Sequence, residues 1–350
     1  MKLLIWGHQY LGDAVLLTTV FTDIVQAYPN AEITLVASPA VCQLLAGHPA
    51  LTTLHPFHKT HPLFNTAAVL ARLQRTLFDV VVGVKPSLRT LNSLRQVRAK
   101  QRIMMAKHPL DALLIRLVLG HASVYDKTLH HTQNLRRLFK KVLPLLDITA
   151  PPVLWLPVPP PSEAFVPPST PALPLRPSSP STKVLGLHLF SSDTAKDYPP
   201  EAWLAWIQQE LPRLLPNQAQ PLQAASPSLA DSLDAPPLLD VWLWGSPEQA
   251  DALKALLPVW QAVLAPWRVH LRCCVGYTWT EIIESLAWVQ EQWGVDSVMA
   301  HVAASQGVPT FTAFKHTPSH RWAVVEHAKL SCLGETVKHT LHRVYQGSLI

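Results

Sequence analysis

Charged residues are scarce in this chain of 350 residues. Asp, Glu, Lys and Arg make up 15% of it, whereas 48% is hydrophobic. Despite that composition, no apolar run reaches the roughly 18 residues that a membrane-spanning helix needs, so no such helix is predicted. The apolar residues are therefore available for a substantial core, and the length suffices for two domains.

Cysteine is also rare, and common catalytic motifs are missing. The four cysteines, at positions 42, 273, 274 and 332, have neither CxxC nor zinc-ligand spacing, so no metal site is predicted. Few cysteines and the absence of a signal peptide before Met1-Lys2 favour a reducing cytoplasm. The sequence contains no GxxxxGK[ST] phosphate loop, no GxGxxG fingerprint, no HExxH and no GxSxG.

Acidic residues are fewer than basic ones, 23 against 29, which gives a formal net charge of +6 besides 17 histidines. The positive excess is concentrated in residues 89–107 and 136–141. This distribution favours an anionic partner. Nucleic acid, a phosphorylated sugar and an anionic membrane surface all qualify, and charge alone does not choose among them.

Strand-like and helix-like segments alternate over residues 1–150, which predicts an α/β domain with a parallel, doubly wound sheet. The predicted strands are Leu3–Trp6, Glu32–Ala37, Leu51–His55, Asp79–Val84 and, at an edge, Gln101–Met104. The predicted helices begin at Asp13 and continue with Pro39–Leu45, Asn65–Leu77, Asn92–Arg98, His108–Leu119 and His131–Leu145.

The 33 prolines cluster in the middle of the chain. Residues 151–183 are too rich in proline for a regular helix or an interior strand, so they are interpreted as a linker. A second α/β domain follows over 184–325, with a polar surface insertion at 216–237. Its predicted strands are Val184–Leu189, Asp240–Trp244, Val269–Arg272 and Thr310–Ala313, and its helices are Glu201–Leu211, Pro247–Leu257, Thr280–Val289 and Met299–Ser305. One or two further helices are expected in the tail, over Glu326–His342.

The first 28 residues predict a strand, a loop with Gly7 and Gly12, and a helix from Asp13. Ligands of open parallel sheets bind beyond the carboxyl ends of the strands, where this loop lies. From the local pattern alone, the commoner use of Asp13 would be as an N-cap.

The order LGDAVLLTTVFTDIVQAYPNAEITLVASP resembles the opening of the heptosyltransferases, glycosyltransferase family 9. In that family the Asp of the Gly-Asp pair is the proposed catalytic base, and the resemblance implies that role for Asp13. It also implies the GT-B fold: two Rossmann-like, doubly wound lobes that face a central cleft, with residues 326–350 packing back on the first lobe.

The loop after the strand Val184–Leu189 carries a second part of the resemblance. His188, Ser191, Ser192, Lys196 and the pair Tyr198-Pro199 match the family's pattern. Hydroxyls, loop N–H groups and a lysine suit a donor diphosphate. The alternative is a solvated lysine in an ordinary strand–helix loop.

The stretch GVDSVMAHVAASQGVP resembles the family's C-terminal signature, with Asp296 and His301 on its Asp and His. The chain departs from the pattern at Ser297-Val298, where Thr-Gly is usual, and thereby loses the backbone freedom of glycine. Asp296 is expected to cap the following helix and to help position the donor. The alternative is a capped helix without a ligand.

The remaining candidates rest on weaker matches. Glu248, in the turn after Trp244, corresponds to an acid that can bind the nucleoside ribose, although the position could instead fall on Gln249. Lys107 and His131 stand where the family carries a basic residue and a His near its anionic acceptor. Solvated helix-end charge is an equally good reading of both.

The resemblance implies an inverting, metal-independent glycosyltransferase without a cofactor. It would transfer a heptose or related sugar from a nucleotide-diphosphate donor to the lipopolysaccharide inner core, in the cytoplasm or at the inner-membrane surface, and nucleic acid is not expected as a partner. No Asp-x-Asp pair for a metal-bound diphosphate is present. The alternative is a diverged, non-catalytic protein of the same fold that binds a sugar nucleotide or an anionic glycan.

Overall fold

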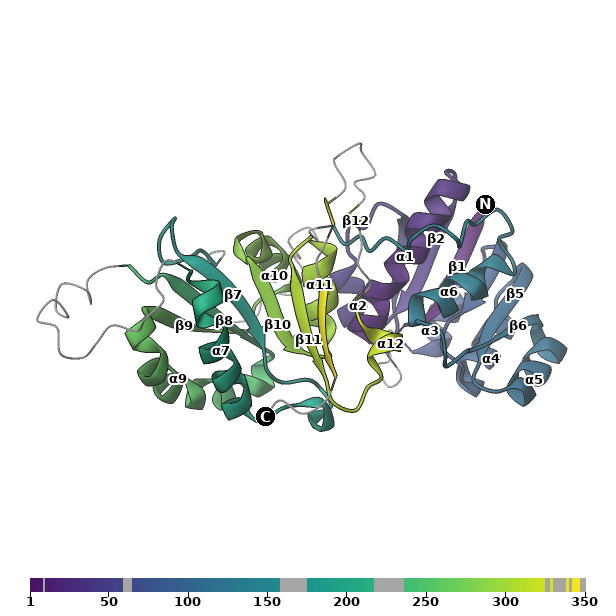
Figure 1. Cartoon of the computed structure of the whole chain (residues 1–350). Coiled ribbons are helices and arrows are strands. Elements are labelled where there is room, and N and C mark those ends of the chain that lie inside the picture. Colours follow the sequence, from purple (N-terminus) through teal and green to yellow (C-terminus); the bar gives the residue numbers. More distant parts are fainter. Residues whose placement is uncertain are drawn as a thin grey trace, which may run out of the picture. The chain divides into compact units, whose positions relative to one another are not determined.

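The computed structural model describes residues 1–8, 10–58, 65–157, 175–216 and 236–324, and the backbone of 328–329, 338–339 and 342–346. The chain divides into two compact units (Figure 1). One comprises Met1–Val166 with His327–Lys338, and the other Pro167–Glu326 with His339–Ile350. Within the described ranges, no helix combines the length and apolarity needed to cross a bilayer.

The first unit contains a six-stranded parallel sheet of order β3-β2-β1-β4-β5-β6. Its strands are β1 (Lys2–His8), β2 (Glu32–Ala37), β3 (Leu51–Pro56), β4 (Phe78–Gly83), β5 (Ala99–Ala106) and β6 (Gly120–Val124). Its helices are α1 (Leu11–Ala27), α2 (Pro39–Leu44), α3 (Thr66–Leu73), α4 (Leu88–Gln96), α5 (Pro109–Leu119) and α6 (His131–Lys140).

The second unit repeats this order with its own strands, β9-β8-β7-β10-β11-β14, again all parallel. The strands are β7 (Lys183–His188), β8 (Leu239–Gly245), β9 (Val269–Val275), β10 (Glu291–Val295), β11 (Thr310–Phe314) and β14 (His342–Gln346). The helices are α7 (Pro200–Leu214), α9 (Ala250–Leu264), α10 (Trp279–Ser285), α11 (Val298–Ser305) and α12 (Ser319–Trp322), with short 3₁₀ turns η1 (Thr194–Lys196), η2 (Pro247–Gln249), η3 (Ala265–Trp267) and η4 (Leu286–Trp288). The short strands β12 (Ala328–Lys329) and β13 (Lys338–His339) pair with each other.

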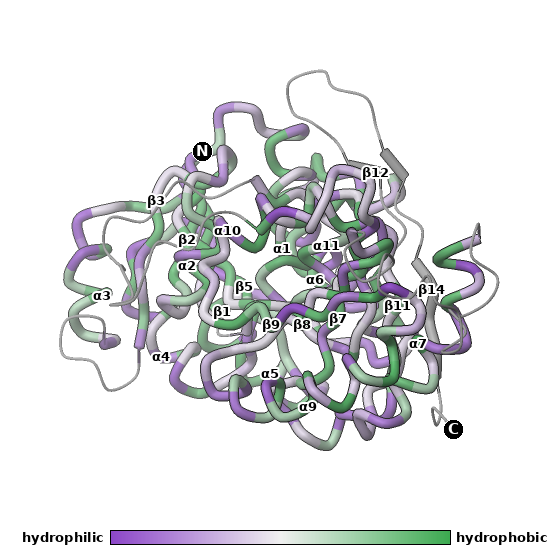
Figure 2. The backbone as a smooth tube through the Cα atoms, turned by 90° about the vertical axis from the view of Figure 1, so that its left-hand side faces the viewer, coloured by the Kyte–Doolittle hydropathy of each residue, from purple (hydrophilic) through white to green (hydrophobic). Residues whose placement is uncertain are grey.

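Each sheet is buried between helices, as parallel sheets require. Leu3, Leu4 and Ile5 of β1 are fully buried, and the core of the second unit is built around tryptophans such as Trp203 and Trp293. Helix α3 carries mainly hydrophobic residues, of which Val69, Leu70 and Leu73 are buried (Figure 2). The doubly wound α/β architecture predicted for both halves is therefore confirmed.

The prediction that Gln101–Met104 forms an edge strand was wrong. β5 runs from Ala99 to Ala106 and lies between β4 and β6, so β6 is the edge strand. Sequence analysis missed β6 because its five residues, Gly120–Val124, follow α5 without an intervening loop. A strand that short carries little periodicity of its own.

Several helix boundaries also differ from the prediction. Helix α4 begins at Leu88, four residues before the predicted start at Asn92, because Ser87 caps it by accepting a hydrogen bond from the Thr90 N–H at 3.1 Å. Helix α9 continues through Pro258 to Leu264 instead of ending at Leu257. Proline usually breaks a helix, yet Pro258 lies inside α9.

The predicted linker is shorter than residues 151–183. Val153, Leu154 and Leu156 are buried, and the Trp155 N–H donates a hydrogen bond to Thr18 Oγ1 at 3.2 Å. The apolar run VLWL therefore anchors residues 153–156 to the first unit despite the adjacent prolines. Residues 158–174 lie outside the described residues, as do 217–235 of the predicted insertion.

The helical prediction for the tail was wrong where the structure describes it. The described residues of 326–346 form the short strands β12 and β13 and the strand β14, which pairs in parallel with β11. Val344 and Tyr345 are typical strand residues, and β11 offers a sheet edge whose backbone groups need partners.

We predict that His48 makes the protein less stable in acid. Its buried ring accepts from the Ala50 N–H at Nδ1, 3.2 Å away, which leaves Nε2 to donate to the Trp155 carbonyl at 3.2 Å. Burial lowers the pKa of His48 from 6.5 to about 4, so the unfolded chain binds a proton that the folded chain excludes. Stability from this group is complete above pH 6.5 and falls by about 3 kcal/mol as the pH drops toward 4.

Urea unfolding of the wild type and of His48→Asn across this pH range measures the effect. The variant should show a smaller loss of unfolding free energy in acid. His121→Asn, which removes an exposed imidazole, is the matched control and should keep the wild-type slope. Equal slopes for all three proteins would contradict the assignment to His48.

Candidate functional site

The candidate donor residues lie at the point where the strand order of the second sheet reverses. β7 and β10 are neighbours, although the chain continues from β7 to β8 on the other side. Loops that leave the carboxyl ends of two such strands form the usual ligand crevice of an open α/β sheet. The loop after β7 carries Lys196, and the turn after β10 carries Asp296 and Ser297.

Lys196 and Asp296 form an ion pair, with Lys196 Nζ 2.8 Å from Asp296 Oδ2. The lysine side chain is 27% exposed and the carboxylate only 9%. Turn η1, which Asp193 begins by accepting from the Ala195 N–H at 3.2 Å, places Lys196 there. The structure thus brings together two residues that the sequence motifs singled out 100 positions apart.

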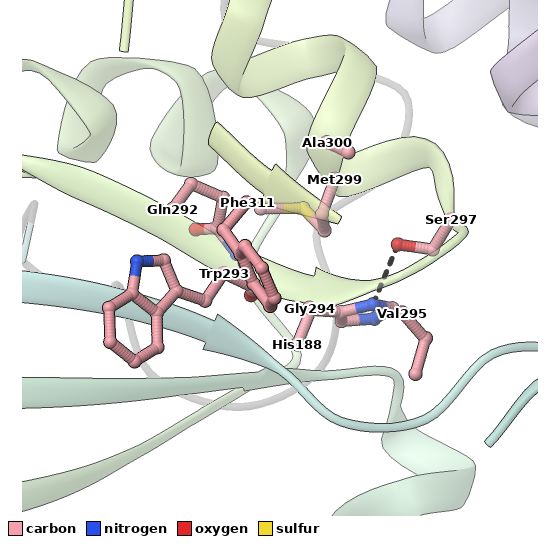
Figure 3. A pocket seen from close by; sticks show the side chains of 9 residues that line it. All are labelled: His188, Gln292, Trp293, Gly294, Val295, Ser297, Met299, Ala300 and Phe311. Carbon is pink, nitrogen blue, oxygen red and sulfur yellow. Dashed lines mark hydrogen bonds between the residues drawn. The ribbon is translucent and has the colours of Figure 1, made fainter. Parts of the chain in front are cut away.

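The expectation that Asp296 caps the following helix was wrong. The N-cap position of α11 belongs to Ser297, and within the described structure its hydroxyl makes no capping bond to that helix. Ser297 Oγ instead lies 2.9 Å from Nδ1 of His188, at the end of β7 (Figure 3). Burial lowers the pKa of His188 to about 4, so its imidazole is neutral near pH 7.

Close packing fixes this junction. A Cβ on Gly294 would lie 2.6 Å from the backbone oxygen of His188, so β10 can approach β7 only with glycine at that position. The side chains around His188 and Ser297, among them Met299 and Phe311, line a recess without room for a water molecule (Figure 3). A ligand would therefore lie outside this recess, against the loops.

The departure from Thr-Gly at Ser297-Val298 does not disturb the backbone. Val298 is the first residue of α11, and Arg268 is the one non-glycine residue with positive φ in the described part of the chain. The helix therefore begins without the conformational freedom that glycine provides.

The other candidate donor-binding residues differ in their burial and in their hydrogen bonds. Ser191 Oγ donates to the Asp193 carbonyl at 2.6 Å, whereas Ser192 is exposed. Glu248 is exposed in η2, and a hydrogen bond from Ser246 lowers its pKa. His301 is buried within α11.

Gln249 has a structural role that the sequence pattern does not predict. Its Oε1 accepts from the Ser246 N–H at 3.0 Å and its Nε2 donates to the Phe190 carbonyl at 3.3 Å. The side chain thereby joins the loop after β8 to the loop after β7. A pairing across 59 residues leaves no local signal.

In the first unit, Asp13 is the third residue of α1, which begins at Leu11 after Tyr10. The N-cap interpretation of Asp13 was therefore wrong, because Tyr10 occupies the N-cap position of α1. Its carboxylate is half-buried in the first turn, where the helix dipole favours negative charge. The preceding strand ends in a bulge at Gly7, with φ +114°, at the equivalent strand-order reversal between β1 and β4.

The acceptor candidates belong to the same unit. Lys107 is exposed just after β5, and parallel strands place it at the same sheet edge as the loop after β1. His131 begins α6 with its side chain buried, and its ring centroid lies 5.9 Å from that of Tyr125. The side chain of His131 is therefore packed in the interior of the first unit, whereas that of Lys107 is exposed to solvent.

No family model matches the sequence, and a search of curated proteins found no match. Solved structures do match over nearly the whole chain. A glycosyltransferase family 9 protein from Veillonella parvula is 13% identical with a TM-score of 0.69, covering 99% of this chain and 86% of its own. The E. coli heptosyltransferase WaaC with ADP is 16% identical (TM-score 0.67; coverage 99% and 93%), and E. coli ADP-heptose lps heptosyltransferase II is 16% identical (TM-score 0.66; coverage 100% and 94%). The resemblance is confirmed at the level of the fold: this chain has the GT-B fold of the family 9 glycosyltransferases.

Proposed function

We propose that the protein is an inverting, metal-independent glycosyltransferase that transfers a heptose or related sugar from an ADP-linked donor to the lipopolysaccharide inner core. One observation carries the proposal: Lys196, Asp296 and Ser297, all in family 9 motif positions, meet at the strand-order reversal of the second sheet. Among the solved structures of this fold is WaaC with ADP-2-deoxy-2-fluoro heptose, at 16% identity and a TM-score of 0.63.

The second unit would bind the donor. Lys196 would supply positive charge to the diphosphate, and the exposed hydroxyl of Ser192 would donate a hydrogen bond to it. Glu248 is exposed and, as a carboxylate with a lowered pKa, suits the ribose hydroxyls. These fixed donors would stabilise the departing diphosphate in place of a metal ion.

The first unit would supply the base. Asp13, in the first turn of α1 where the helix dipole favours negative charge, would accept the proton of the acceptor hydroxyl. The acceptor oxygen then forms its bond to the anomeric carbon as the carbon–oxygen bond to the diphosphate breaks on the opposite face. The diphosphate leaves with that electron pair, and the configuration inverts. Lys107 and the basic residues near it would attract the anionic acceptor.

Lys196→Met is expected to weaken ADP binding by roughly 10–100-fold, the usual loss for a charge-assisted hydrogen bond. It would also leave the carboxylate of Asp296 facing the phosphates without its cation. Calorimetry with ADP measures the change. Lys254→Met removes an exposed lysine on α9 as the matched control and should leave the affinity unaltered. Equal affinities for both variants would remove Lys196 from the donor site.

The activity itself is tested by mass spectrometry of a truncated core acceptor incubated with the protein and ADP-heptose. A mass increase of one heptose supports the proposal, and analysis of the new linkage shows whether the configuration inverted. Binding of ADP without transfer from any sugar nucleotide tested would instead favour the non-catalytic, sugar-nucleotide-binding alternative.

A further inference from the structure

Helix α5 is apolar on the side that faces away from the sheet. Its inner face packs on β5 and β6 through Ala112, Ile115 and Leu119. The outer face carries large apolar side chains three and four positions apart, of which Leu110 is 81% and Leu117 78% exposed. The full set, called the α5 outer face below, is Leu110, Leu113, Leu114, Leu117 and Val118.

Such a face is unusual, because an outer helix next to an edge strand normally turns polar residues to solvent. α5 borders β6, the edge strand of the first sheet (Figure 1). Exposed apolar residues are common one at a time, but a contiguous group on one helix face marks a binding surface.

The part of the chain that includes the α5 outer face is strongly basic, although one of its basic residues, Arg136, is buried and paired with Asp23. Residues 85–141 contain thirteen Lys and Arg but only two acidic residues, Asp111 and Asp126. Helix α4, which packs against α5, exposes Arg89 and Arg95, and α5 itself exposes Arg116.

A second basic group lies beside Arg116, at the end of α6. Burial and the nearby charges of Arg116 and Arg137 lower the pKa of Lys141, whose Nζ donates to the Ala122 carbonyl at 3.0 Å. Of the two acidic residues, Asp126 pairs with Arg137 at 3.3 Å, and Asp111 accepts from the His108 N–H at 3.2 Å. Positive charge therefore predominates around the apolar group.

From this combination we infer that the α5 outer face docks on the surface of an anionic phospholipid bilayer. The leucines would enter the boundary between headgroups and acyl chains, and the flanking lysines and arginines would contact the phosphates. A second copy of the chain is a less suitable partner for the α5 outer face than an anionic bilayer. A symmetric dimer through this face would bring the same basic residues together, and one helix face is small for a stable protein interface.

Vesicle flotation of the full-length protein tests the inference. Phosphatidylcholine vesicles are compared with vesicles that also contain phosphatidylglycerol, and neither contains lipopolysaccharide, so binding does not report on the acceptor site. We expect binding to the anionic vesicles alone, weakening as salt screens the charges. Leu110→Ser with Leu117→Ser should reduce the partition coefficient at least ~10-fold.

Val259→Ser with Val263→Ser is the matched control, because it removes two exposed apolar residues from α9 in the other unit and should not change binding. Circular dichroism checks that both double variants are folded; if the serines disturb α5, Leu110→Gln with Leu117→Gln repeats the test with better helix formers. Equal binding by a folded α5 variant and the wild type would overturn the inference. So would sedimentation showing a dimer that the α5 variant dissociates, because the face would then be an interface between copies.

Discussion

Replacing Asp13 with Asn is expected to lower the rate of sugar transfer by about 10²–10⁴-fold, the usual contribution of a general base. Asparagine keeps the size and position of the side chain in the first turn of α1 but does not accept the proton. ADP binding should remain nearly unchanged, because the proposed donor residues belong to the second unit. Single-turnover rates and calorimetry on the same preparation separate the two effects.

The chain offers a matched control for this variant. Asp111 is also the third residue of its helix, α5, so Asp111→Asn removes the same favourable interaction with a helix dipole. It should retain ordinary transfer to a detergent-solubilised acceptor. Transfer by Asp13→Asn at the rate of Asp111→Asn would show that Asp13 contributes only to the helix.

Replacing Arg136 with Met is expected to lower the free energy of unfolding by about 3–5 kcal/mol, because it leaves a buried carboxylate without its cation. Arg136 Nε and Nη2 donate to the two oxygens of Asp23 at 2.6 and 3.0 Å, and both side chains are buried. Burial raises the pKa of Asp23, whereas Arg136 lowers it. Arg136 also donates to the carbonyls of Ala150 and Asp147, so it fixes the chain after α6 to α1.

Denaturant unfolding measures this loss, and the next residue provides the control. Arg137 pairs with Asp126 at 3.3 Å on the surface, so Arg137→Met should cost less than about 1 kcal/mol. Arg136→Met with Asp23→Leu should recover part of the loss, since no charge then remains buried. A similar, small cost for both single variants would show that the buried pair is not important for stability.

Local pattern sufficed to predict most of the fold. The apolar run DVVVGV and the segment Glu32–Ala37 are strands as predicted, because continuous apolar residues indicate strands buried on both faces. The elements that local pattern missed depend on tertiary context. β6 is stabilised by pairing with β5, β10 (Glu291–Val295) by pairing with β7 and β11, and β14 by an open edge of β11, and none of these pairings has a signal in its own few residues.

In the candidate site, too, local motifs predicted some features, whereas others depend on tertiary contacts. Motif resemblance singled out Lys196 and Asp296, but their ion pair depends on β7 and β10 being neighbours, which only the topology provides. The hydrogen bond between His188 and Ser297 spans 109 residues, and it explains why Ser297 does not cap its own helix. The N-cap prediction for Asp13 failed because helix α1 begins two residues earlier, at Leu11.

The ion pair between Lys196 and Asp296 has a consequence for turnover under the proposed function. The ammonium group of Lys196 is paired with the carboxylate of Asp296 within the same chain, so its positive charge is partly neutralised there. A diphosphate that binds there must compete with Asp296 for the ammonium group of Lys196. After the product nucleotide dissociates, the ion pair between Lys196 and Asp296 forms again. The ion pair between Lys196 and Asp296 would thus favour selective binding of the diphosphate and rapid release of the product nucleotide.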